Sequence, residues 1–402
     1  MKKMASPFLS DTVSAPEATF FLPDTDVPDL EFAGIKAQYA ALREVIAPQI
    51  AGVFRHCQFV NGPEITELED ALADFAGVNH AIGLSSGTDA LIAPMLAEGI
   101  GQGDAVFLPA FTFTATAEVP LLLGAAPVFV DVDPRTFNID LADLEAKIDV
   151  VRAEGVLKPR AIIPVDLFGL PAEHAALNQI ADKEGLFLLA DAAQSFGGRR
   201  GNRRVGSLAP VTATSFFPAK PLGCYGDGGA VFTDDAKLAA GVRSVRNHGQ
   251  GAEKYAIDQV GLNARLDTLQ AAILLAKLPS LDREIEARNR LADRYDSFLA
   301  DICITPQRDA DAHSAFAQYC ILVDDRDGVQ SRLAEASIPT AIYYPKPMHV
   351  QEPYARFGDG PGSLPVSEGL SRCILALPIH GYMRDEVADR IGEMVRLAIT
   401  RT

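Results

Sequence analysis

Apolar residues along the chain follow two different spacings, and these spacings alternate through most of its length. Short unbroken apolar runs are typical of strands buried in a parallel sheet, whereas apolar residues three or four apart are typical of helices. The predicted strands cover residues 80–84, 105–108, 127–132, 161–165, 186–190 and 211–217. The predicted helices cover residues 31–54, 64–75, 90–98, 141–154, 268–278 and 281–300. This alternation predicts an α/β fold with a mostly parallel sheet and right-handed crossovers.

The long charged helix predicted over residues 281–300 marks a change of organisation. We expect a large domain over residues 29–280 and a smaller C-terminal α/β domain over residues 281–402. Residues 1–28 contain repeated prolines and no periodicity, so we expect a loose N-terminal extension there. A chain of 402 residues with 48% hydrophobic content can bury the core of two such domains.

Charge and cysteine content narrow the classes of function. The net charge of −17 argues against a surface that binds nucleic acid or an anionic membrane. No apolar run approaches the length of a membrane span, and Asp11 interrupts the start of the chain, which excludes a signal peptide. The five cysteines form no C-x-x-C pair. We therefore expect no metal centre and a protein of the reducing cytoplasm.

Two strand ends carry the first candidate chemistry. Asp191 follows the strand predicted over 186–190, and Lys220 follows the strand predicted over 211–217 in a loop rich in proline and glycine. Ligands of open α/β sheets bind beyond the carboxyl ends of the strands. An acid and a lysine there suit pyridoxal phosphate, because the acid would keep its pyridine nitrogen protonated and the lysine would bind its aldehyde. Taken singly, either residue could be an ordinary turn cap or loop cation.

A third strand end offers a place for a phosphate. Ser85-Ser86-Gly87-Thr88-Asp89 joins the strand predicted over 80–84 to a helix. A small glycine-containing turn at this point leaves backbone N–H groups free at the positive end of the helix dipole. The alternative is a plain helix cap by Ser86 or Thr88. Further on, an aromatic side chain after the strand over 105–108 could stack on a pyridine ring or pack in the core.

Two other patterns are set aside. Gly99, Gly101 and Gly103 follow a helix and are succeeded by Asp104, so they do not form the dinucleotide fingerprint that a nicotinamide oxidoreductase would need. The arginines between Gly198 and Gly206 could attract a nucleotide diphosphate. We expect them instead at an exposed hairpin tip and leave them out of the site. These arginines are Arg199, Arg200, Arg203 and Arg204.

Two longer stretches resemble a known family. The segments ADAAQSFG at 190–197 and TSFFPAKPLGCYGDGGA at 214–230 are similar to the DegT/StrS family of sugar aminotransferases. The resemblance runs from about Glu31 to the end of the chain and implies the fold-type I architecture of pyridoxal-phosphate enzymes. The chain departs from the family at Phe32-Ala33-Gly34, where an Ile-Asp-Leu opening is usual.

The resemblance implies roles for individual residues at the cofactor. Lys220 and Asp191 are the expected catalytic residues, and Gly87 and Thr88 are expected to hold the cofactor phosphate. The family pattern P-x-x-T-F-x-A-T favours Phe113 over Phe111 as the stacking residue. The residues expected to bind pyridoxal phosphate are Ser86, Gly87, Thr88, Phe113, Asp191, Gln194, Ser215, Lys220 and Asn263.

Further motifs imply a dimer and a substrate site. In the stretch G-x-N-x-R-L-D, the resemblance implies that Asn263 crosses a homodimer interface to the partner's cofactor phosphate, although Asn263 could also cap the following helix. The segment AIYYPKPMHVQ resembles the family's substrate loop. The residues expected to contact substrate are Arg265, Tyr343, Tyr344 and His349.

The implied activity is transfer of an amino group from an amino acid, expected to be glutamate, to a nucleotide-linked keto sugar in surface-polysaccharide or related amino-sugar biosynthesis. The stretches KPLGCYGDGGA, RLDTLQAAILLAKL and AIYYPKPMH resemble members that aminate C3 of a UDP-linked 2-acetamido-3-keto-hexuronic acid. Amination at C4 of a keto-deoxysugar, a pyridoxal-phosphate dehydratase and a non-catalytic regulator are the alternatives. Lys220 and the scattered cysteines disfavour the dehydratase, and the acidic chain offers no DNA-binding module for a regulator.

Overall fold

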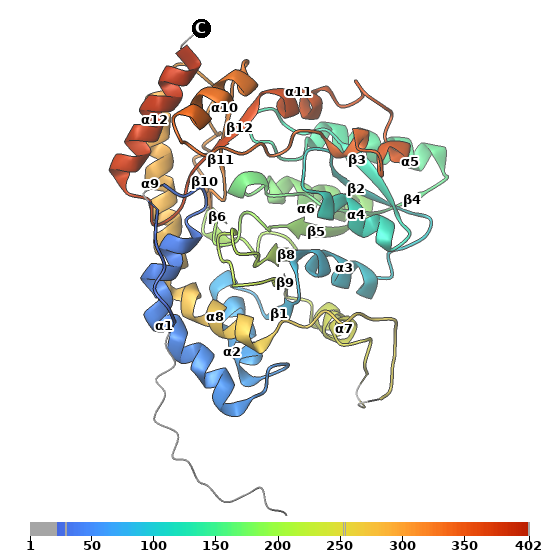
Figure 1. Ribbon diagram of the computed structural model, residues 1–402. Coiled ribbons are helices and arrows are strands. Elements are labelled where there is room, and N and C mark those ends of the chain that lie inside the picture. Colours follow the sequence, from blue (N-terminus) through green and yellow to red (C-terminus); the bar gives the residue numbers. More distant parts are fainter. Residues whose placement is uncertain (1–21, 29, 252, 254, 401–402) are drawn as a thin grey trace, which may run out of the picture.

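The computed structural model describes residues 22–28, 30–251, 253 and 255–400. Most of the expected N-terminal extension, including the segment where a signal peptide was excluded, lies outside these residues. Residues 22–28 form neither helix nor strand. Figure 1 shows a central sheet covered by helices, with the C-terminal elements gathered at one end of the molecule.

The central sheet has seven strands in the order β1-β9-β8-β5-β4-β2-β3. Its strands are β1 (His80–Leu84), β2 (Asp104–Pro109), β3 (Ala126–Val130), β4 (Lys158–Ile162), β5 (Phe187–Asp191), β8 (Val211–Ser215) and β9 (Gly229–Thr233). All pair in parallel except β9, which runs antiparallel to both β1 and β8. The predicted mostly parallel sheet is therefore confirmed, whereas β9 was not predicted because its short apolar run follows a glycine-rich loop directly.

Helices cover both faces of this sheet. Successive side chains of a strand point to opposite faces, so each buried strand packs its apolar side chains against helices on both sides. Leu189 of β5 packs in a cluster with the helices of one face, and Leu188 and Ala190 pack with those of the other. The first face carries α3 (Gly87–Ala97), α4 (Thr114–Leu122) and α7 (Ala236–Arg246). The second face carries α2 (Pro63–Ala76), α5 (Leu141–Glu154), α6 (His174–Glu184) and α8 (Thr268–Lys277).

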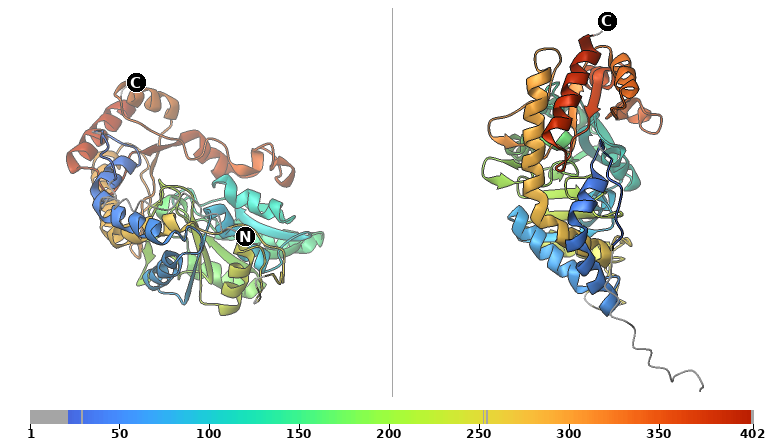
Figure 2. Two further views of the ribbon diagram at one scale, coloured as in Figure 1. Left: turned by 60° about the horizontal axis from the view of Figure 1, so that its bottom comes forward. Right: turned by 60° about the vertical axis from the view of Figure 1, so that its left-hand side comes forward.

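The C-terminal elements have a core of their own, centred on the buried rings of Tyr295 and Tyr319. Around this core lie α9 (Leu281–Leu299), α10 (Arg326–Glu335) and α12 (Asp385–Thr400), and β11 (Tyr319–Leu322) pairs with β12 (Ile374–Leu377). Helix α11 (Pro365–Cys373) packs instead in a cluster with Phe111 and Phe137. Helices α9 and α12 lie side by side, as both views of Figure 2 show. Helix α1 (Ile35–His56) packs along α8.

A small three-stranded sheet joins the two regions. It consists of the hairpin β6 (Arg199–Arg200) and β7 (Arg203–Arg204) together with β10 (Ala312–His313). The hairpin expected from the arginine cluster is thus present. Arg200 forms ion pairs with Asp309 and Asp311, and Arg204 forms one with Asp282. Several of these arginines are therefore engaged in holding the hairpin to acidic neighbours.

Short 3-10 helices complete the fold, namely η1 (Leu167–Gly169), η2 (Leu278–Ser280), η3 (Met348–Val350) and η4 (Ala355–Phe357). Across the described ranges, no helix is long and apolar enough to cross a membrane. Within the same ranges, no three histidine, cysteine or acidic side chains are grouped so that they could hold a metal ion.

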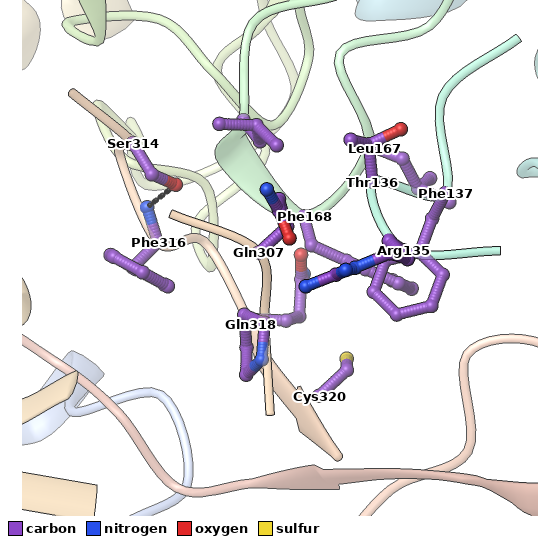
Figure 3. A pocket seen from close by; sticks show the side chains of 12 residues that line it. Arg135, Thr136, Phe137, Leu167, Phe168, Gln307, Ser314, Phe316, Gln318 and Cys320 are labelled. Atoms are coloured by element: carbon purple, nitrogen blue, oxygen red, sulfur yellow. Dashed lines mark hydrogen bonds between the residues drawn. The ribbon is translucent and has the colours of Figure 1, made fainter. Parts of the chain in front are cut away.

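A cavity of about 20 Å³ lies between η1 and the segment that leads into β11. Figure 3 shows the side chains of Arg135, Gln307 and Gln318 pointing toward one another across it. A volume of this size holds about one water molecule. None of the residues predicted for catalysis or for cofactor binding lines this cavity, so the candidate site lies elsewhere.

Candidate active site

The ends of three strands meet at one edge of the central sheet. Strands β5 and β8 are parallel neighbours, with Asp191 opposite Ala213, so both end on the same side. Strand β9 aligns Gly229 with Ser215 on one flank and with Leu84 on the other. The antiparallel β9 therefore brings the end of β1, and the turn that follows it, to the same edge as β5 and β8.

Asp191 is a buried carboxylate with fixed orientation. The residue is 7% exposed, and its carboxylate accepts hydrogen bonds from the hydroxyl of Thr116 (2.9 Å) and the backbone N–H of Ala193 (3.2 Å). Burial raises the pKa of Asp191, while the N–H of Ala193, the hydroxyl of Thr116 and the charge of Lys220 act in the opposite direction. Such a carboxylate is suited to face a cationic group.

Lys220 lies in the loop that leaves β8. Its backbone N–H donates to the carbonyl of Phe217 (2.9 Å), and the loop closes where Cys224 N–H donates to the carbonyl of Phe216 (2.8 Å). Burial lowers the pKa of Lys220, and the negative charge of Asp191 partly offsets that effect. A lysine held in this way has a larger share of neutral, nucleophilic amine than a surface lysine has.

The turn after β1 enters the N-terminus of α3. Ser86 caps this helix, and its side chain accepts a hydrogen bond from the backbone N–H of Asp89 (3.0 Å). A Cβ atom on Gly87 would lie 2.6 Å from the Cβ atom of Ser215, so only glycine fits at this position. The cap expected as the alternative to a phosphate site is therefore present. It leaves the unpaired N–H groups of the first helical turn available to an anion.

Aromatic side chains line the approach to Asp191. Phe113 exposes 53% of its surface at the start of α4, whereas Phe111 is completely buried. The ring of Tyr344 lies 6.3 Å from that of Phe113 and 6.2 Å from that of Phe111, measured between centroids. Of the two phenylalanines, only Phe113 therefore has a free face, and its stacking role stays a prediction.

Gln194 connects the turn after β5 to this aromatic group. Its side-chain oxygen accepts from the backbone N–H of Phe168 (2.6 Å), and its amide nitrogen donates to the hydroxyl of Tyr344 (3.2 Å). Burial raises the pKa of Tyr344, so its phenol stays protonated. The structure thus gathers Asp191, Gln194 and Tyr344, although Tyr344 lies far from the other two in sequence.

The remaining residues predicted to contact substrate differ in how far they are exposed. Arg265 donates to the side-chain oxygen of Asn263 from Nε (3.0 Å) and Nη2 (2.6 Å), and Asn263 is exposed. Tyr343 is half-buried beside Tyr344. His349 is completely buried and its Nε2 lies 3.1 Å from Oε1 of Glu368. His349 therefore supports its loop from beneath in this chain, and contact of its side chain with substrate stays a prediction.

Three residues near the site were not predicted. Thr116 donates a hydrogen bond to Asp191 and so orients it. The sequence offered one sign of this: Thr116 lies one helical turn after Thr112, and the two hydroxyl oxygens are 3.0 Å apart. Asp166 accepts from Ser195 and follows an apolar run just as Asp191 does. Lys277 is buried in α8 and donates to the carbonyl of Gly223 in the Lys220 loop. No sequence signal marks Lys277, because it falls on an ordinary amphipathic helix.

Comparison with known proteins gives consistent matches over most of the chain. Residues 41–396 match the model of the DegT/DnrJ/EryC1/StrS aminotransferase family. The chain is 46% identical over 355 residues to the UDP-2-acetamido-2-deoxy-3-oxo-D-glucuronate aminotransferase of Pseudomonas aeruginosa, covering 88% of this chain and 96% of that protein. The solved structure of a family member from Brucella abortus has a TM-score of 0.91 and 48% identity, covering 92% of this chain and 100% of that one.

A third match is a structure that contains pyridoxamine phosphate (PMP), the amine form of pyridoxal phosphate. The structure of NtdA from Bacillus subtilis, solved with bound PMP, has a TM-score of 0.84 and 28% identity, covering 98% of this chain and 90% of that one. The residues of the present chain fit pyridoxal phosphate. Asp191 would hold the ring nitrogen, Lys220 the aldehyde, and the glycine turn at 86–88 the phosphate, in a cradle that any Cβ atom on Gly87 would fill.

We expect Lys220 to be the residue that binds the cofactor covalently. Borohydride reduction of the holoprotein followed by peptide mapping should place a pyridoxyl adduct on Lys220. The variant Lys220→Ala should still bind the cofactor, because the phosphate and ring contacts persist, and should lose turnover by about 10⁴-fold. An adduct on Lys183 or Lys277 would contradict the assignment.

Replacing Asp191 by asparagine should leave the fold and most of the cofactor affinity intact, since the two side chains have nearly the same size. Turnover should fall by about 10²- to 10³-fold, because a charge that faces the reacting system is lost. Steady-state kinetics measure the effect. Asp235→Asn is a matched control, as Asp235 caps α7 after β9 and asparagine caps a helix equally well. Near-normal turnover in Asp191→Asn would remove Asp191 from the mechanism.

Proposed function

This chain belongs to the DegT/DnrJ/EryC1/StrS aminotransferase family, and from that premise we propose that it transfers an amino group from glutamate to C3 of a UDP-linked 2-acetamido-3-keto-hexuronic acid. The protein is a pyridoxal-phosphate-dependent nucleotide-sugar aminotransferase. The observation that carries the chemistry is the placement of the buried Asp191 and the half-buried Lys220 at one sheet edge. The choice of sugar is supported by the 46% identity to the Pseudomonas aeruginosa enzyme.

Lys220 is the group that moves protons in this reaction. When bound, pyridoxal phosphate carries the amino group between the two substrates and draws electron density away from the reacting carbon. The Nζ atom of Lys220 takes the proton from the α-carbon of the amino-acid donor in the first half of the reaction. In the second half it delivers a proton to C3 of the sugar. Both tasks need an amine that gains and loses a proton near neutral pH, and the lowered pKa of Lys220 serves that need.

Asp191 has a fixed electrostatic task. Thr116 and the N–H of Ala193 hold its carboxylate in one orientation, and burial raises its pKa above that of a surface aspartate. When the cofactor is bound, Asp191 would accept a hydrogen bond from the ring nitrogen and favour its protonated form. Phe113, with its exposed face, would limit the position of the ring, and Tyr344 lies beside Phe113.

The substrate assignment is tested with purified holoenzyme and two acceptors. Glutamate alone should convert the absorbance of the aldehyde form of the cofactor into that of the amine form. The UDP-linked 3-keto-hexuronic acid should then be aminated at C3 with a kcat/KM about a hundredfold or more above that for a dTDP-linked 4-keto-6-deoxysugar. No spectral change would reject glutamate as donor, and a preference for the 4-keto sugar would reject amination at C3.

We also propose that the working unit is a homodimer with shared active sites. Asn263 is exposed, and the backbone beside it joins the end of β1, where Ser85 N–H donates to the carbonyl of Ala264 (3.0 Å). The same region exposes apolar side chains, since Phe59 and Val60 are 40% and 44% exposed and Val60 pairs with Asp267. An exposed apolar area beside an exposed polar residue suits a second copy of the chain.

Subunit mixing distinguishes shared sites from separate ones. Lys220→Ala and Asn263→Ala are each expected to be inactive alone. If Asn263 serves the partner's site, a mixed dimer contains one site with both defects and one with neither, so activity returns to about a quarter of the wild-type value when subunits mix at random in equal amounts. Verified subunit exchange without recovered activity would show that each chain supplies its own Asn263.

A further inference from the structure

A second buried carboxylate lies directly behind the turn that carries Asp191. Asp166 exposes none of its surface, and its two oxygens accept three hydrogen bonds, two from the 172–174 segment and one from Ser195. Oδ1 accepts from the backbone N–H of Ala172 (2.9 Å) and from Nε2 of His174 (2.8 Å), and Oδ2 accepts from the hydroxyl of Ser195 (2.7 Å). Asp166 therefore joins the segment after β4 to the turn after β5.

The turn held in this way contains the predicted cofactor residues Asp191 and Gln194. The backbone N–H of Asp166 donates to the carbonyl of Asp191 (3.0 Å), and Ser195 follows Gln194 directly. The two segments are also in close contact at Gly169, where a Cβ atom would lie 3.1 Å from the carbonyl oxygen of Gln194. The position of the Asp191 turn thus depends on the segment that Asp166 organises.

Asp166 also acts on Asp191 through its charge. Its negative charge raises the pKa of Asp191, in the same direction as burial. The charged or titratable groups facing this pair are His174 on the side of Asp166, and Lys220 and Tyr344 on the side of Asp191. A like charge behind a carboxylate makes that carboxylate a stronger base, so Asp191 holds a cationic partner more firmly.

We propose that Asp166 is a positioning residue for amino transfer, which fixes the Asp191 turn through Ser195 and, by its negative charge, favours protonation of the ring nitrogen that Asp191 faces. The proposal rests on the proposed function, because it takes Asp191 as the partner of that nitrogen. His174 belongs to the same unit. Its Nε2 donates to Asp166, while its Nδ1 has no partner among the residues that the structure describes.

The alternative is that Asp166 only caps the backbone turn that ends at Ala172. A capping role predicts a loss of stability on substitution and no change in the electronic state of the cofactor. A positioning and electrostatic role predicts that the ring nitrogen changes its protonation. The measurement must therefore report on that nitrogen directly, rather than on activity alone.

The test uses Asp166→Asn, which keeps the shape of the side chain and removes its charge. The protein is reconstituted with ¹⁵N-labelled pyridoxal phosphate, and the ¹⁵N chemical shift of the ring nitrogen is measured at neutral pH. We expect the wild-type nitrogen to be protonated and that of Asp166→Asn to move toward the unprotonated value. Turnover should fall about tenfold, the factor carried by one pKa unit of lost basicity, with little change in KM.

A matched control is available at the edge of the same sheet. Asp131 is also a buried carboxylate, and it accepts hydrogen bonds from the backbone N–H groups of Val366 and Ser367. It follows β3, which β2 and β4 separate from β5. Asp131→Asn should lower the melting temperature and leave the ¹⁵N shift unchanged, which separates a general effect of losing a buried carboxylate from an effect specific to Asp166.

Ser195→Ala tests the connection without removing the charge and serves as the second variant if Asp166→Asn does not fold. The turn that carries Gln194 loses one anchor, so the dissociation constant of the cofactor should rise about fivefold, while the ring nitrogen stays protonated. An unchanged dissociation constant and turnover in Ser195→Ala would reject the positioning role.

Asp191→Asn is the third variant, and it distinguishes failure of the proposal for Asp166 from failure of the role assigned to Asp191. If the ¹⁵N shift changes in Asp191→Asn but not in Asp166→Asn, the proposal for Asp166 is overturned and the proposed function stands. If neither substitution changes the shift, Asp191 is not the partner of the ring nitrogen, and both the assignment of Asp191 and the proposal that rests on it are rejected.

Discussion

The candidate active site is built around a carboxylate, that of Asp191, held inside the protein. Burial of an unpaired charge costs several kcal/mol, so the carboxylate of Asp191 needs fixed donors and a cationic partner. Thr116 of α4 and the backbone N–H of Ala193 are the donors, and the parallel register of β5 and β8 places the loop of Lys220 at the same edge as Asp191. The antiparallel strand β9 then brings the end of β1 to the same edge, with the glycine turn that suits a phosphate.

Two lysines near this edge are withdrawn from solvent, the buried Lys277 and the half-buried Lys220, and their surroundings differ. Burial lowers the pKa of Lys277 to about 8, so its pKa alone would suit a nucleophile. However, its amine donates to the carbonyl of Gly223 and lies 4.8 Å from the ring centroid of Tyr225. A cation over an aromatic face is stabilised there. Lys277 therefore holds the loop in place, while Lys220 of that loop is the lysine beside Asp191.

Local patterns in the sequence were sufficient to predict which residues lie at the strand ends, but not which residues contact them in the fold. Short apolar runs and a glycine turn are local features, so Asp191, Lys220 and the turn at 86–88 could be proposed as site residues from them. The roles of Thr116 and Asp166 depend on which strands become neighbours, and no local pattern encodes that order. The burial of His349 follows from its pairing with Glu368, nineteen residues later, which periodicity does not reveal.

The side chain of Tyr344 is joined to the turn after β5 by a hydrogen bond with a defined direction. The amide of Gln194 donates to the hydroxyl oxygen of Tyr344, so the phenol's own proton is free to be donated elsewhere. Burial and the charge of Asp191 raise the pKa of that phenol, which keeps the proton in place at neutral pH. Tyr344 therefore presents a hydrogen-bond donor beside Phe113, between the sheet edge that carries the proposed catalytic residues and the loop predicted to contact the sugar. A change in that loop can then alter sugar recognition while Asp191 and Lys220 keep their positions on the sheet.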